Sequence, residues 1–127
     1  MQTPEELHYS PDHEWIRVEG DNRIRLGITD FAQDALGDVV YVDLPQVGRS
    51  VAKGESISEV ESTKSVSDIY APLAGQVVEV NDELADAPDK LNSDPYGEGW
   101  ICIIELESTN DLSSLLTASA YIELTEA

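Results

Sequence analysis

The sequence predicts a mainly β fold: a sandwich or flattened barrel of short antiparallel strands, with a few short helices at its periphery. Apolar residues alternate with period two over several short segments. Breakers such as Gly48, Gly54 and Pro72 interrupt these segments at intervals typical of sandwiches and barrels. A Gly-x-Val-Val-x-Val pattern also occurs twice, over 37–42 and 75–80, which suggests two similar halves with approximate two-fold symmetry.

The chain opens with a predicted hairpin and a short helix. Residues 15–18 lead into the turn formers 19–22, and residues 23–28 then alternate between apolar and polar. For the helix that follows, we expect Asp30 as the N-cap, with Gln33 in a loose capping-box position. Gly37 stands where a left-handed C-terminal cap is expected.

The rest of the core is predicted to be strands. They are expected at 37–42, within 47–54, and at 56–61, 66–70, 75–80 and 100–106. The imperfect alternation across 57–69 indicates a bulge or a tight, non-ideal turn.

Two less regular segments complete the chain. The polar stretch 82–99 is rich in turn formers, so it is expected to be either functional or an ordered cover. Leu112, Leu115 and Leu116 follow the polar residues 109–111 at helical spacing, and residues 121–124 could add one more turn. The sequence therefore predicts a single domain over 1–127, with its core at about 15–107 and a helical segment at about 110–125.

The charge balance excludes several classes of partner. There are 26 acidic and 7 basic residues, for a formal net charge of -19. Nucleic acid and anionic membranes are disfavoured, because both require clustered Lys and Arg. The longest apolar run, 100–104, is too short to span a bilayer, and residues 1–6 do not form a signal peptide, so a cytoplasmic location is expected. Adaptation to high salt or acid is an alternative explanation of the charge.

Few residues offer catalytic or metal chemistry. His8 and His13 are the two histidines, and Cys102 is the single cysteine, so they make a poor set of metal ligands. Cys102 lies within an apolar segment and is expected to be a buried hydrophobe. The acidic residues Glu59, Glu61 and Asp68 are most simply a solvated face.

Lys64 is the most informative residue. It lies between two strand-like segments and among small hydroxyl residues, at or near the tip of a predicted hairpin. An exposed tip does not provide the burial that a Schiff-base lysine needs. Two interpretations are left: an ordinary exposed lysine, or an acceptor for an acyl group that a ligase activates.

The surrounding blocks resemble a known family. The central block reads Glu59-x-Glu61-Ser62-x-Lys64-Ser65-x-Ser67-Asp68-Ile69-Tyr70-Ala71-Pro72, followed by Gly75. Further matching blocks lie at Tyr9, 13–15, 27–30, 32–33, 36–40, 42–45, 92–96, 99–100 and 115–116. With these blocks in order over nearly the whole chain, the sequence closely resembles the H proteins of the glycine cleavage system, a family of lipoyl carriers. Biotin acceptors share the hairpin but typically place Met beside the lysine, where this chain has Thr63 and Ser65.

The resemblance implies a sandwich of the lipoyl- and biotinyl-carrier type, with lipoate bound covalently to Lys64. It implies a carrier rather than an enzyme, and a monomer. The arm would accept an aminomethyl group from glycine at the pyridoxal-phosphate glycine decarboxylase and deliver it to the tetrahydrofolate-dependent aminomethyltransferase. Dihydrolipoyl dehydrogenase would then reoxidise the arm. An H-like protein acting mainly in lipoyl relay to other complexes is the alternative.

The resemblance also nominates further residues. Glu61 and Gly75 match positions linked to recognition by the lipoyl-attaching enzyme. A labile aminomethyl adduct would need a protective cleft, and its protonated amine would need acids, for which Glu14, Asp68 and Asp12 are nominated. Each has a simpler interpretation: a surface carboxylate for these three, a cross-strand pair for Glu61 and a turn with positive φ for Gly75.

Overall fold

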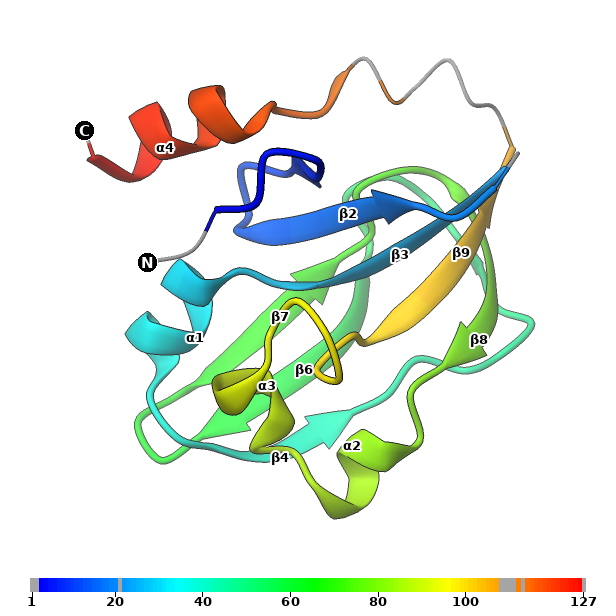
Figure 1. The fold of residues 1–127 in the computed structure, drawn as a ribbon. Helices are drawn as coiled ribbons and strands as arrows, with labels where there is room; N and C mark the ends of the chain where they lie inside the picture. The colour runs from blue at the N-terminus through cyan, green and yellow to red at the C-terminus, as the bar shows by residue number, and fades with distance from the viewer. Residues whose placement is uncertain (1–2, 21, 108–111, 113, 127) are drawn as a thin grey trace.

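The computed structural model describes residues 3–20, 22–107, 112 and 114–126. Within them the chain forms two antiparallel sheets, and helices lie around the sheets (Figure 1). This confirms the mainly β prediction, and neither sheet closes on itself as a barrel. Among the described residues, no helix combines the length and apolar character that crossing a bilayer requires.

One sheet has six strands and the other has three. In spatial order the larger sheet contains β1 (His8–Tyr9), β2 (Glu14–Val18), β3 (Arg23–Ile28), β9 (Cys102–Leu106), β8 (Gly75–Val80) and β5 (Ser50–Val51). The smaller sheet contains β4 (Val39–Asp43), β6 (Ser56–Ser62) and β7 (Val66–Tyr70). The predicted first hairpin is confirmed as β2–β3, and the two-residue strand β1 was not predicted.

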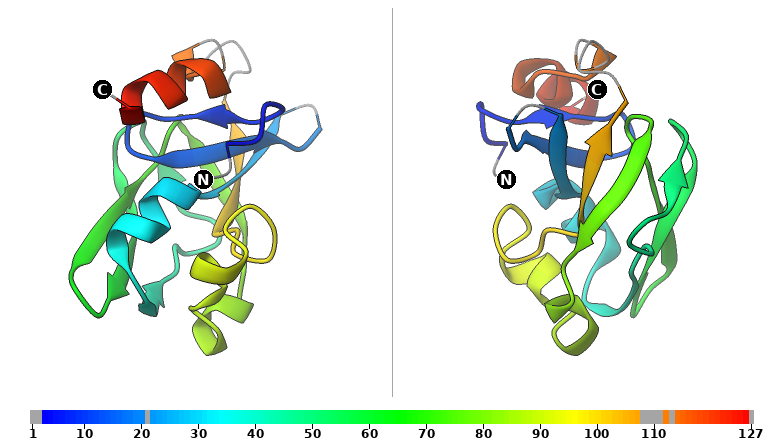
Figure 2. Two further views of the ribbon diagram at one scale, coloured as in Figure 1. Left: turned by 60° about the vertical axis from the view of Figure 1, so that its left-hand side comes forward. Right: turned by 90° about the vertical axis from the view of Figure 1, so that its right-hand side faces the viewer.

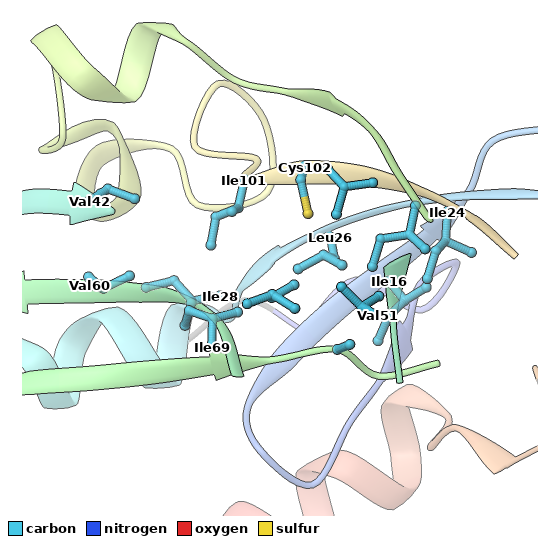
Figure 3. Packing of buried hydrophobic residues seen from close by; sticks show 14 of the residues in the cluster. Ile16, Ile24, Leu26, Ile28, Val42, Val51, Val60, Ile69, Ile101 and Cys102 are labelled. Atoms are coloured by element: carbon cyan, nitrogen blue, oxygen red, sulfur yellow. The ribbon is translucent and has the colours of Figure 1, made fainter. Parts of the chain in front are cut away.

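The main core lies between the two sheets. Apolar side chains of both sheets point into the same layer, as Figure 3 shows for Leu26 and Ile28 on one side and Val60 and Ile69 on the other. Cys102 lies in this layer, fully buried, and burial raises the pKa of its thiol to about 12. The expectation that this cysteine acts as a small hydrophobe is confirmed.

Helix α1 (Asp30–Leu36) begins at the residue predicted to be its cap, one residue earlier than expected. The N-cap is Thr29, whose hydroxyl accepts a hydrogen bond from the Ala32 backbone amide, so the prediction of Asp30 was wrong. The hydroxyl of a threonine before the first helical residue can satisfy an otherwise unpaired amide, as the carboxylate of an aspartate can. Gly37 ends the helix with a positive φ of 81°, as expected of a glycine cap, but its ψ of −158° places it outside the left-handed helical region.

The stretch 82–99 is an ordered cover. It contains two single-turn helices, α2 (Glu83–Asp86) and α3 (Lys90–Ser93). Leu84 and Leu91 are fully buried in the main core, so these turns close the end of the sandwich. Both views in Figure 2 show them together at one end of the molecule.

The C-terminal segment differs from the prediction. Residues 109–111 lie outside the described residues, and α4 spans Ala118–Glu126. Leu116 is extended instead of helical, because its backbone exchanges hydrogen bonds with Tyr9 at 2.9 and 2.7 Å. Tyr121 of α4 stacks on Tyr9, and both belong to a second apolar cluster with Trp15.

Two strands with the same sequence pattern contain the same irregularity. The register of β4 against β6 shifts between Val39 and Tyr41, and the register of β8 against β9 shifts between Val77 and Glu79. The two shifts occupy equivalent places in the Gly-x-Val-Val-x-Val pattern. For the segment 57–69 a bulge or a tight, non-ideal turn was predicted, and the register of β6 against β7 shifts between Ser56 and Ser58, at the end of the hairpin away from Lys64.

Candidate functional site

Lys64 lies in the turn that joins β6 to β7. The Ser62 amide donates to the Ser65 carbonyl, and the Ser62 hydroxyl accepts from the amides of Lys64 and Ser65 at 3.2 and 3.1 Å. The Thr63 amide donates to the carbonyl of Asp38 at 3.0 Å, which fastens the turn to the residues after α1. The turn backbone is therefore held without any contribution from the lysine side chain.

The Lys64 side chain is exposed and passes over Gly37. A Cβ at Gly37 would lie 3.3 Å from the Lys64 Cε and 3.7 Å from its Nζ. Within the described residues, the Lys64 ammonium forms no ion pair and donates no hydrogen bond. A fixed backbone that carries a free amine is the arrangement an acylating enzyme requires of its acceptor.

Asn92 of α3 holds the segment between α1 and β4, to which the Lys64 turn is hydrogen-bonded. Its Oδ1 accepts from the Val39 amide at 2.8 Å, and its Nδ2 donates to the Gly37 carbonyl at 2.8 Å and to Gln33 Oε1 at 3.1 Å. One side chain thus joins the end of α1 to the start of β4. The cover segment contributes directly to the position of the Lys64 turn.

A groove of about 350 Å³ begins beside the turn. Its walls are residues 65–69, the side of α1 that faces them, and residues 12–13. Ile28, Phe31 and Leu36 supply apolar surface, and Asp12 and Asp68 supply carboxylates. The groove can therefore hold a flexible apolar chain and offer negative charge to a cation at its end.

Glu14 is 1% exposed and is not one of the groove-lining residues. Its carboxylate accepts from the Tyr70 amide at 2.7 Å and from the Ser10 hydroxyl at 3.0 Å. Burial raises the pKa of Glu14 to about 8, and the two hydrogen bonds only partly offset that effect. The residue joins β2 of one sheet to the end of β7 in the other.

His13 connects the groove to the C-terminal helix. It has φ 67°, the only positive φ of a non-glycine residue in the described chain. Its Nδ1 lies 2.9 Å from the Tyr121 hydroxyl, which in turn lies 2.7 Å from the Thr29 hydroxyl. Its ring packs against Phe31, with centroids 4.9 Å apart, and burial lowers the pKa of His13. Tyr121 therefore supports both the groove wall and the cap of α1.

Comparison with known proteins identifies the family. The sequence model of the family described as "Glycine cleavage H-protein" matches residues 7–127. The chain belongs to this family. It is 51% identical over 121 residues to the glycine cleavage system H protein of Coprothermobacter proteolyticus, covering 95% of each chain. It is 58% identical over 123 residues to that of Nocardia farcinica, covering 94% of this chain and 93% of the relative.

A solved structure supports the assignment. The crystal structure of a glycine cleavage system H protein from Mycobacterium marinum matches with a TM-score of 0.89 and 46% sequence identity. The match covers 98% of this chain and 99% of that one. The fold described above is therefore an H-protein fold over almost its full length.

The structure brings only some of the nominated residues together. Asp12 and Asp68 line the groove, Lys64 directly precedes the lining residue Ser65, and Glu61 is exposed on β6 next to the turn. Gly75 lies in the other sheet, is buried, and does not have a positive φ. A Cβ there would overlap the Glu105 carbonyl oxygen, so the glycine permits close strand contact and the expected positive-φ turn was wrong.

Sequence reasoning missed several residues of this H protein's site. Asn92 and Tyr121 stood in segments treated as a loop and a tail, and His13 was noted without a role. Asn92 lay within a block that matched the family, which was the available signal. For Tyr121 no local pattern points to a histidine 108 positions earlier in the chain.

Proposed function

We propose that this H-protein family member carries lipoate on Lys64 and shuttles the aminomethyl group of glycine between the enzymes of the glycine cleavage system. Its partners would be the pyridoxal-phosphate glycine decarboxylase, the tetrahydrofolate-dependent aminomethyltransferase, dihydrolipoyl dehydrogenase and the lipoyl-attaching enzyme. The observation that carries the proposal is the Lys64 turn, a rigid backbone with a free, exposed amine at the mouth of a partly apolar groove.

The residues present fit a lipoyl group. Attachment joins the Lys64 nitrogen to the acyl carbon of an activated lipoate, with loss of the activating group and of a proton from the amine. The new amide removes one positive charge and leaves an apolar chain next to Phe31 and Leu36. When bound, lipoate supplies a disulfide that can accept the aminomethyl group and be reoxidised afterwards.

The chain's own residues would bind and protect the arm rather than catalyse. The walls of the groove exclude water from a group that is prone to hydrolysis. Asp12 and Asp68 can pair with a protonated amine at the groove, while buried Glu14 holds the Tyr70 end of β7 in place. Tethering raises the local concentration of the carried group at each docked enzyme.

Mass spectrometry after incubation with lipoate, ATP and a lipoate ligase tests the attachment. We expect a single lipoyl addition on the Lys64 peptide, lost in Lys64→Arg and retained in Lys53→Arg, a matched change at another exposed lysine. No addition to the folded chain by a ligase active on another substrate would refute the proposal.

Exchange of labelled bicarbonate into glycine by glycine decarboxylase tests the shuttle. The lipoylated chain should support exchange that Lys64→Arg does not. A lipoylated chain that supports none, with a decarboxylase active on another H protein, would leave lipoyl relay as its role.

A further inference from the structure

Exposed apolar side chains gather next to the Lys64 turn. In the described part of the chain, four of the larger apolar residues are more than half exposed. Val40, Tyr41 and Val66, at 52%, 55% and 59%, lie on the two strands that flank β6. The fourth, Val47 at 61%, lies in the loop before β5. Solvated apolar residues are ordinary when scattered, but these three lie on one small sheet.

Strand register places two of these residues in one row. Tyr41 pairs with Glu61, and Glu61 pairs with Val66, so the three side chains lie side by side on one face of the smaller sheet. This row is the last ladder pairing before the Lys64 turn. Any surface that reaches the lysine from this face would therefore meet Tyr41 and Val66 first.

The next row on the same face is entirely acidic. Asp43 pairs with Glu59, and Glu59 pairs with Asp68, all three exposed. The three strands contain four acidic residues and no Lys or Arg. None of the four forms an ion pair with another described residue. We call the two rows together the outer patch. Its two members on the edge strand β7, Val66 and Asp68, also line the groove.

We propose that the outer patch is the docking surface for the lipoyl-attaching enzyme, an inference that rests on the proposed function. The partner surface would have an apolar contact for Tyr41 and Val66, with Lys or Arg side chains opposite Asp43 and Glu59. This enzyme must recognise the chain before any arm exists. It therefore depends on fixed protein surface around Lys64, and the outer patch is the surface that shares a hairpin with it.

The test compares rates of lipoyl addition by a lipoate ligase, with lipoate and ATP, as the concentration of the chain is varied. For Tyr41→Ser/Val66→Ser we expect kcat/KM to fall about tenfold or more through a higher KM, because central apolar contacts dominate interfaces. The matched control, Val18→Ser/Val47→Ser, removes exposed apolar groups elsewhere and should react as the wild type does. Circular dichroism and thermal unfolding check that all variants are folded.

Charge is tested by the dependence of kcat/KM on salt. Wild-type kcat/KM should fall as salt screens the acidic row, and Asp43→Asn/Glu59→Gln should flatten that dependence. Glu79→Gln/Glu107→Gln removes the same charge from exposed positions away from the outer patch and should keep the wild-type slope.

A binding assay separates docking from acceptor chemistry. The Lys64→Arg chain should inhibit lipoylation of the wild type competitively, and adding Tyr41→Ser/Val66→Ser to it should abolish the inhibition. If the patch variants react and compete as well as the wild type, the outer patch is not the docking surface, although Lys64 is still the acceptor. If the wild type itself is not lipoylated, the proposed function fails and this inference fails with it.

Discussion

Strands β4 and β8 share a sequence pattern and a bulge, yet they differ in their position in the sheet and in how exposed their side chains are. Val39 and Val77, the first valines of the two patterns, are both buried. β8 is paired on both sides, by β5 and β9, and Val78 is partly buried. β4 is an edge strand, and Val40 is 52% exposed. The local pattern thus predicts the strand and its bulge, while the surroundings of each strand in the fold decide whether its residues are packed or exposed to solvent.

The glycines that begin the two patterns show the same contrast. Gly37 has φ 81° and lies beneath the flexible stem of Lys64. Gly75 has no positive φ, but it is wedged against the Glu105 backbone and the Ile104 side chain. One glycine is needed for its backbone conformation, and the other for its lack of a side chain.

Substitution of Glu14, whose side chain links the two sheets, should have the largest effect on the free energy of unfolding. Glu14, on β2, holds the end of β7, and its pKa of about 8 in the folded chain exceeds its ordinary value of 4.5. The folded state therefore keeps a proton that the unfolded state releases, and stability falls as pH rises from about 4.5 to 8. Glu14→Gln removes this loss. The free energy of unfolding of the variant minus that of the wild type should therefore rise by roughly 4 kcal/mol between pH 5 and pH 9.

Urea unfolding at pH 5, 7 and 9 and constant ionic strength would measure that gain. The relevant quantity is the difference between variant and wild type, since the many other acids affect both equally. A difference independent of pH would show that Glu14 is ionised throughout and that the sheets are joined by a buried carboxylate.

Gly75→Ala should be the next largest effect. Its Cβ would overlap the Glu105 carbonyl and lie 2.7 Å from Ile104 Cγ2, in a strand paired on both sides. We expect a loss of about 3 kcal/mol, because neither neighbour can move without disturbing the sheet. Urea unfolding measures it, and a loss below about 1 kcal/mol would show that β8 and β9 can move apart enough to admit a methyl group.

Asn92→Ala should cost about 2 kcal/mol, since it leaves the Val39 amide and the Gly37 carbonyl without their partner. The lost hydrogen bonds hold the segment between α1 and β4, which supports the Lys64 turn. The rate of lipoyl addition should therefore fall as well. Asn92→Asp can still accept from Val39 but cannot donate to Gly37, and should give an intermediate loss. If both variants keep the wild-type rate, the turn does not depend on this segment.

Gly37→Ala should have the smallest effect on stability, about 1.5 kcal/mol, because φ 81° with ψ −158° is a backbone conformation that is essentially restricted to glycine. Its Cβ would also displace the Lys64 stem, so lipoyl addition should slow. Gly48→Ala is the matched control: φ is 94° there and a Cβ would meet nothing within 4 Å. If Gly37→Ala and Gly48→Ala are equally stable and accept the lipoyl group at equal rates, Lys64 does not rest on Gly37 during attachment.

Local patterns were enough to predict much of this structure. The alternation around Leu26 and the hydroxyl-rich turn at Lys64 depend on near neighbours, and both predictions hold in the fold. The burial of Glu14 depends on Tyr70, which is 56 residues away, and local sequence does not show it. The outer patch likewise requires the register of three strands, because Tyr41 and Val66 become neighbours only through Glu61.

The burial of Cys102 has a practical consequence for the proposed attachment of a disulfide cofactor. Its thiol is inaccessible, and its pKa of about 12 leaves almost no thiolate at neutral pH to attack a disulfide. If Lys64 carries lipoate as proposed, the scaffold would therefore not trap that arm in a mixed disulfide, and electrons delivered to the arm would stay available to the next enzyme. Any thiol titrated on the native, lipoylated chain would then report the reduction state of the arm alone.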